Sequence, residues 1–165
     1  MINIEYDFDV RMYRDIYNQY MVDMFEIGDT NDKALMKIPF VFDCGATYTV
    51  LNKDMAEMRK WNIFKREGVY LGSYITDGKY IVYDLRKIPK LIFGVKQIEN
   101  LVVATPSDGR IKVSNLLGRS FIDNFGHGVD PDNGRIFFKH RNIIVDPEVS
   151  FGRMMNNNIK DLEYK

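Results

Sequence analysis

The fold of this chain is decided by one stretch, Phe40-Val41-Phe42-Asp43-Cys44-Gly45-Ala46-Thr47. Three apolar residues run directly into an aspartate, and a glycine follows two positions later, as in a buried strand that enters a tight turn. Such a turn holds a carboxylate at the end of a strand. Because many unrelated turns use this aspartate only to bond the backbone two residues further on, the stretch alone leaves its role open.

A second stretch, about seventy residues downstream, reads Leu116-Leu117-Gly118-Arg119-Ser120-Phe121. Together the two stretches resemble the retropepsins, the single-domain aspartic proteases. In that family an Asp-Thr-Gly-Ala loop follows an apolar strand, and an apolar-apolar-Gly triplet later opens a short helix near the C-terminus. The order and spacing agree, and the resemblance covers roughly residues 35 to 140.

The resemblance implies a homodimeric aspartic endopeptidase with Asp43 as its catalytic residue. Two carboxylates that share one proton act as base and acid on a water molecule. The chain holds no second Asp-Thr-Gly or Asp-Ser-Gly, so the dyad would combine Asp43 from each of two subunits about a twofold axis. The active-site loop would then contain Cys44, Gly45, Ala46 and Thr47, and the substrate would be a polypeptide.

Two further groups of residues receive roles from the same resemblance. The loop would be supported from below by Leu117, Gly118 and Arg119. A flap that closes over an extended peptide would contain Thr76, Asp77, Gly78 and Lys79. The simpler interpretation, that Asp77-Gly78 is only a surface hairpin turn, carries comparable weight.

The loop departs from the family pattern at two positions. Cys44 replaces the usual Thr or Ser, whose hydroxyl bonds across the dimer, and a thiol is a weaker donor. Thr47 stands where retroviral members carry an acid that pairs with the Arg after the glycine, so Arg119 would lack that partner. The first change puts activity in doubt more than the fold.

The remaining sequence predicts a mainly β domain with one or two short helices, in the form of a closed or bent retropepsin-like barrel. Turn dipeptides occur at Asp77-Gly78, Asp108-Gly109 and Asn133-Gly134. Short helices are expected over 53–60, capped by Asn52, and within 116–125. Strands are expected at 34–42, 49–51, 69–71, 80–83, 90–93, 101–104 and 137–138.

The first 27 residues allow either a helix or a strand. Residues 1–33 are expected to be an N-terminal extension or dimer-interface segment, 34–150 the protease domain and 151–165 a C-terminal tail. The apolar residues of the N-terminal segment are expected to pack in the core or the dimer interface rather than to form a separate partner-binding surface. They are Tyr6, Tyr13, Tyr17, Tyr20, Met21 and Met24.

Composition and charge reduce the number of partners and cofactors that we expect. With 23 basic and 23 acidic residues among 165, no net field draws the chain to nucleic acid or to an anionic membrane. We expect no cofactor and no metal, since one cysteine and two histidines supply too few ligands for a structural zinc site. The single Cys44 and the acidic N-terminus, which does not resemble a secretory signal, fit a cytoplasmic protein.

Two other functions remain open. A catalytically silent retropepsin-like domain would keep the dimer and bind peptides without cleaving them, with Asp43 serving only its own loop. A cysteine-dependent hydrolase would need a histidine beside Cys44, and only His127 and His140 exist. We expect His127 in a loop and His140 as a surface group at a strand end.

Overall fold

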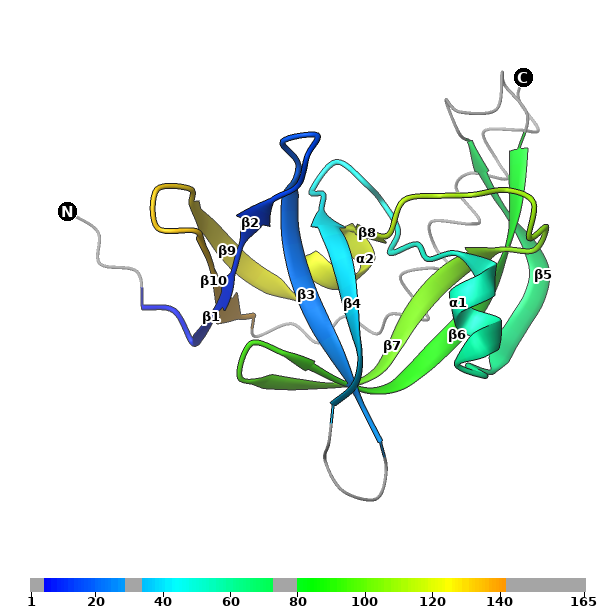
Figure 1. The fold of residues 1–165 in the computed structure, drawn as a ribbon, viewed down its shortest axis with the longest axis horizontal. Helices are drawn as coiled ribbons and strands as arrows, with labels where there is room; N and C mark the ends of the chain where they lie inside the picture. Colours follow the sequence, from blue (N-terminus) through cyan, green and yellow to red (C-terminus); the bar gives the residue numbers. More distant parts are fainter. Residues whose placement is uncertain (1–4, 29–33, 73–79, 142–165) are drawn as a thin grey trace.

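The computed structural model describes residues 5–28, 34–72 and 80–141, and these residues form two sheets and two short helices (Figure 1). The N-terminal half contains β1 (Phe8–Arg11), β2 (Tyr13–Arg14), β3 (Tyr20–Ile27), β4 (Ala34–Phe42), α1 (Lys53–Met58) and β5 (Ile63–Gly72). The C-terminal half contains β6 (Tyr80–Phe93), β7 (Lys96–Pro106), β8 (Leu116–Leu117), α2 (Arg119–Ile122), β9 (Phe125–Asp130) and β10 (Arg135–His140).

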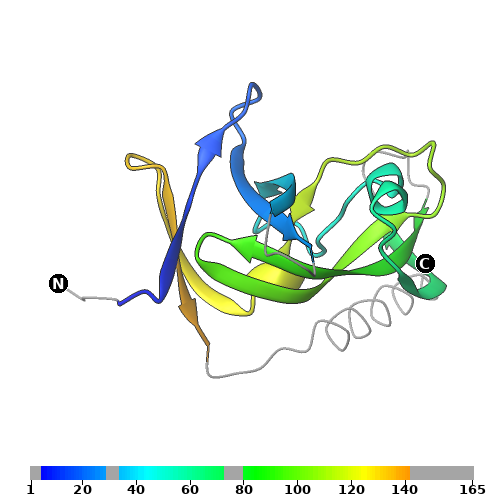
Figure 2. The same ribbon diagram turned by 60° about the horizontal axis from the view of Figure 1, so that its bottom comes forward.

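The larger sheet has seven strands and does not close into a barrel. Its path runs β5-β6-β3-β4-β8, with β2 beside β3 and β7 beside β6. The closed form of the predicted barrel is therefore wrong for the described residues, where β5 and β8 end the path without pairing to each other. β8 has only two residues, and beyond its pairing with β4 it is joined to β7 only through the isolated bridges of Val50. Figure 2 shows the bend of this sheet.

The smaller sheet has the order β1-β10-β9 and packs against the larger one. Aromatic rings join the two sheets. Phe138 of β10 and Phe8 of β1 lie 5.3 Å and 6.2 Å from Phe93 of β6, between ring centroids. Phe121 of α2 lies 5.6 Å from Phe93, so the helix after the second motif belongs to the same core.

The described part of the segment that the sequence left open as helix or strand contains the strands β1, β2 and β3. Val22 and Met24 are completely buried and two residues apart, which is the period of a strand with one face inward. They pair antiparallel with Phe40 and Ile38 of β4. The spacing of two therefore prevails over the approximate helical spacing, because β4 offers an apolar face to match it.

Residues 1–33 were expected to be an extension or interface segment, and this boundary stays a prediction. Within the described part of that segment, β1 pairs with β10 and β3 pairs with both β4 and β6. The expected tail, residues 151–165, lies outside the described residues.

Three secondary-structure predictions differ from the structure in extent. The strands expected at 80–83 and 90–93 are parts of one strand, β6, which pairs with β7 from Tyr83 to Phe93. The helix expected within 116–125 is confined to α2, because Leu116 and Leu117 pair with β4 instead. The strand expected at 49–51 is only an isolated bridge at Val50.

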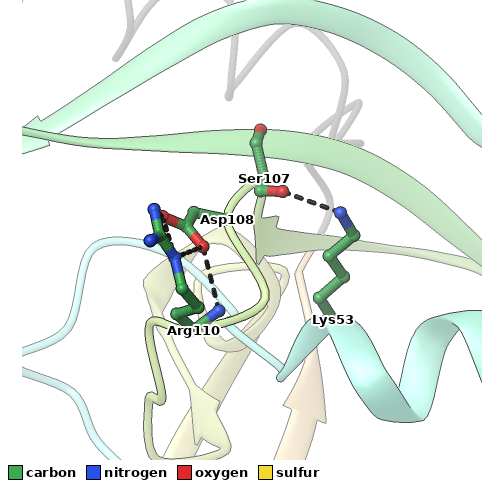
Figure 3. Close-up of polar contacts among 4 residues, drawn as sticks. All are labelled: Lys53, Ser107, Asp108 and Arg110. Atoms are coloured by element: carbon green, nitrogen blue, oxygen red, sulfur yellow. Dashed lines mark hydrogen bonds and ion pairs between the residues drawn. The ribbon is translucent and has the colours of Figure 1, made fainter.

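Two predicted turns have different outcomes. Asn133-Gly134 connects β9 to β10, and Gly134 has a φ of 61°, so that prediction is confirmed. Asp108-Gly109 is not a hairpin turn, because it lies in the long connection from β7 to β8. There the Arg110 guanidinium binds the Asp108 carboxylate, and Lys53 Nζ donates to Ser107 O (Figure 3). Asp77-Gly78 lies outside the described residues.

Helix α1 forms where predicted but is not capped as predicted. Asn52 occupies the N-cap position without a side-chain capping bond. Its amide instead bonds both backbone groups of Val113, with Nδ2 donating at 2.8 Å and Oδ1 accepting at 2.9 Å. Asn52 therefore ties α1 to the connection that leads into β8. Among the described residues, no helix has the length and apolar character needed to cross a membrane.

Candidate active site

The Asp43 carboxylate lies where β4 ends, at the edge of the larger sheet. β4 runs parallel to β8, with Val41 beside Leu116 and Phe42 beside Leu117. The backbone N–H of Asp43 donates to Leu117 O at 3.1 Å, which extends this ladder by one residue. The two sequence motifs are thus hydrogen-bonded neighbours, and their pairing fixes the point at which Asp43 leaves the sheet.

The turn after Asp43 is held by its own backbone. Gly45 N donates to Asp43 Oδ1 at 2.9 Å, and Ala46 N donates to Asp43 O at 3.1 Å. A Cβ added to Gly45 would lie 3.1 Å from the same Oδ1, so a side chain there would crowd the contact between amide and carboxylate. The loop residues Cys44 and Thr47 are exposed, and Asp43 itself is half-buried.

Gly118 is the closest point of contact between the loop and α2. A Cβ at this position would lie 2.2 Å from Tyr48 O and 2.9 Å from Ala46 O, both backbone atoms. The following amides donate into the loop, with Arg119 N 2.8 Å from Ala46 O and Ser120 N 3.0 Å from Thr47 O. Only glycine permits this approach, and Leu117 beside it is completely buried.

A buried polar pair, Thr49 and Ser120, completes the support and was missed by the sequence analysis. Thr49 Oγ1 accepts from Gly118 N at 3.2 Å and lies 3.3 Å from Ser120 Oγ. Ser120 Oγ also accepts from Thr49 N at 3.1 Å. Both residues are buried. The only available signal was a small polar residue beside apolar ones in each motif, and this is too common to single them out.

Arg119 forms its ion pair with Asp123 and not with an acid of the loop. Its side chain is exposed and its Nε lies 3.2 Å from Asp123 Oδ2, within α2 and its C-cap. The expected lack of an acid at position 47 is therefore compensated locally. The Arg119 backbone amide bonds the loop at Ala46 O, and its charge is only a minor influence on the loop, one that opposes the rise in the pKa of Cys44 caused by burial.

Cys44 contacts His127, which lies in β9 and not in a loop as predicted. The Cys44 Sγ and His127 Nε2 atoms are 3.4 Å apart. The Phe42 ring meets the His127 ring edge to face at 5.4 Å and so holds the imidazole beside the loop. Partial burial, and then the neighbouring Asp43 charge, raise the pKa of the Cys44 thiol, so the neutral thiol is favoured. His140 is exposed at the end of β10, as predicted.

The remaining expected site residues cannot be placed. Thr76, Asp77, Gly78 and Lys79, expected in a flap, lie outside the described residues. Within the part of the chain that the structure describes, no group of three or more His, Cys, Asp or Glu side chains is arranged to hold a metal ion.

Comparison with known proteins bears on the fold. No family model and no curated protein matches the chain. Among solved structures it is similar to a retropepsin-like aspartic protease from Rickettsia conorii, with 21% sequence identity and a TM-score of 0.54. The match covers 84% of this chain and 96% of that chain. At this level of identity the likeness shows the fold alone: the chain has a mainly β, retropepsin-like fold.

Proposed function

We propose that this protein is a homodimeric aspartic endopeptidase in which two Asp43 carboxylates, one from each subunit, activate water to hydrolyse a peptide bond. The observation that carries the proposal is the position of Asp43. A half-buried carboxylate at the end of β4 accepts a bond from Gly45 N at 2.9 Å and is supported by Gly118 from a motif seventy-odd residues away. The solved neighbour with this fold is described as an aspartic protease.

The chemistry requires two such carboxylates. Two carboxylates close together cannot both ionise easily, so they share one proton; one removes a proton from water while the other donates to the substrate carbonyl. Another Asp-x-Gly sequence, Asp132-Asn133-Gly134, forms the turn between β9 and β10, which lies apart from β8 in Figure 1. The second carboxylate would therefore come from a second copy of the chain.

A silent, peptide-binding homodimer is the second candidate, and the Cys44 contact favours it. In the described structure the Cys44 Sγ faces His127 at 3.4 Å, and a thiol is a weak hydrogen-bond donor. The loop therefore lacks a hydroxyl at this position to fix its partner loop. This candidate keeps the fold and the dimer but lacks hydrolysis.

The same contact suggests a thiol nucleophile with a histidine base, but its electrostatics oppose that role. A cysteine nucleophile needs a lowered pKa, whereas burial and the adjacent Asp43 charge raise the pKa of Cys44. The carboxylate, not the thiol, is the group we assign to catalysis.

The test is cleavage of an unstructured protein at about pH 4 to 7, the range in which a shared-proton dyad operates. Wild type is compared with Asp43→Asn and with the matched control Cys44→Ala. The proposal predicts cleavage by wild type and Cys44→Ala and none by Asp43→Asn. Cleavage by Asp43→Asn would refute it, loss in Cys44→Ala alone would point to the thiol, and folded dimers without cleavage would favour the silent module.

A further inference from the structure

The turn between β2 and β3, residues 15–19, carries an exposed apolar pair. The side chains of Ile16 and Tyr17 are 91% and 78% exposed. We call these five residues the tip loop. Scattered single apolar residues are normal on a protein surface. Here two large apolar side chains are adjacent at the end of a hairpin, and together they form a projecting apolar surface.

The tip loop is held in one conformation by its own hydrogen bonds. Asp15 Oδ1 accepts from the backbone N–H of Tyr17 and of Gln19, both at 2.9 Å. Asn18 takes a positive φ of 64°, and its Oδ1 accepts from Arg14 at 2.8 Å. A surface that is already ordered loses little conformational entropy on binding. Ile16 and Tyr17 are therefore presented ready for contact.

The register of the sheet places the tip loop beside Asp43. Met21 of β3 pairs with Val41 of β4 in antiparallel fashion, so the start of β3 and the end of β4 lie at the same end of the sheet. Figure 1 shows the β2–β3 turn and the segment after β4 at the same end of the molecule. Arg14 and Tyr20 are the last paired residues of the β2–β3 hairpin, and the pairing of β3 with β4 begins at Met21, so the tip loop extends past these paired strand ends.

We propose that Ile16 and Tyr17 of each subunit pack against the second copy of this chain, next to the paired Asp43 loops. The inference rests on the proposed function, because a shared-proton dyad brings two copies together at the end of the sheet that holds Asp43. When the two Asp43 carboxylates approach to hydrogen-bonding distance, a tip that projects past the strand ends meets the partner subunit. The tip loop is then part of the dimer interface.

The surface area of the two Tyr17 side chains is large enough to matter in a dimer interface. A buried tyrosine contributes about 150–250 Å², so two copies of Tyr17 supply about 300–500 Å². A stable interface buries about 1,200–2,000 Å² in total. The Tyr17 rings therefore account for on the order of a quarter of a dimer interface, and Ile16 adds to it. Their removal should weaken the dimer measurably without unfolding the subunit.

The experiment is sedimentation velocity over a concentration series, with the double variant Ile16→Ser/Tyr17→Ser. Val95→Ser is the matched control, since Val95 is 87% exposed at the tip of a different hairpin, between β6 and β7. Circular dichroism checks that all three proteins are folded. We expect the tip variant to raise the dimer dissociation constant at least tenfold and the control to leave it unchanged.

Three results would overturn the inference: a wild type that stays monomeric at every concentration, a tip variant that dimerises as tightly as wild type, or a control that weakens the dimer equally. A tip variant with an unchanged dimer but altered peptide cleavage would place the tip against substrate instead. Loss of dimerisation in the tip variant, with no Asp43-dependent cleavage by wild type, would support the interface and refute the proposed protease. The two proposals therefore fail separately.

Discussion

Replacing Gly118 by alanine tests how the two motifs hold each other. The added Cβ would lie 2.2 Å from Tyr48 O, 2.5 Å from Tyr48 C and 2.9 Å from Ala46 O. These are backbone atoms, so no side-chain rotation relieves the clash, and either α2 or the active-site loop must move. Movement stretches the bonds that Arg119 N and Ser120 N donate into the loop, at 2.8 and 3.0 Å.

The magnitude follows from these two effects. Overpacking a well-packed site costs about 1–3 kcal/mol, and a rigid backbone clash belongs at the upper end. Two weakened hydrogen bonds add about 0.5–1.5 kcal/mol each. We therefore expect Gly118→Ala to lower the free energy of unfolding by about 4–6 kcal/mol and, at roughly 2–4 °C per kcal/mol in a domain of this size, the melting temperature by roughly 8–24 °C.

The assay is urea unfolding followed by tryptophan fluorescence, since Trp61 is a buried reporter. Gly109→Ala is the matched control, because its Cβ would lie 3.6 Å from the Lys53 side chain and 3.8 Å from Asp54 Oδ1, which is ordinary contact. The control should remain within about 0.5 kcal/mol of wild type. A Gly118→Ala variant as stable as the control would refute the close approach of α2 to the loop.

Three further predictions concern single side chains. Thr49→Val should cost about 1–3 kcal/mol in urea unfolding, because it leaves the buried Gly118 N–H without its acceptor; unchanged stability would contradict the buried pair. Burial and the Asp23 carboxylate raise the pKa of Tyr13 to about 12, so the folded state keeps this proton longer than the unfolded state, and the associated stability, present below pH 10, should be lost as pH rises toward 12. Tyr13→Phe should flatten that decline in denaturant titrations at pH 9 to 12, and an identical decline in both proteins would argue against it. Iodoacetamide should alkylate Cys44 slowly at pH 7 and faster only above the ordinary thiol range, because its pKa is raised; rapid alkylation at pH 7 would contradict the described environment.

Much of the fold could be predicted because the apolar pattern is local. The end of β4 at Asp43, helix α1 and the β9–β10 turn follow from short runs and turn dipeptides. The length of β6 could not be predicted, because Pro89 interrupts its pattern and only pairing with β7 along both halves makes it continuous. The open sheet was missed for a similar reason, since closure depends on whether distant strands pair.

The candidate site was likewise predicted in part. Asp43 and Gly118 were found from two motifs, and the structure brings these motifs together through the β4–β8 pairing. Thr49 was missed because its role depends on a hydroxyl from the other motif. The His127 contact with Cys44 was missed because β9 brings the imidazole to the loop from 83 positions away, a proximity that sequence spacing does not encode.

The central claim, that each active site needs Asp43 from two subunits, is tested most directly by mixing subunits. Wild type is allowed to exchange with an equal amount of Asp43→Asn, and peptide cleavage is compared with that of the same wild-type amount alone. Random pairing leaves about half of the wild-type subunits in wild-type dimers, so the account predicts that activity falls to about half and falls further with excess variant. Activity that stays unchanged at every ratio, although exchange is verified by sedimentation of a tagged variant, would contradict it.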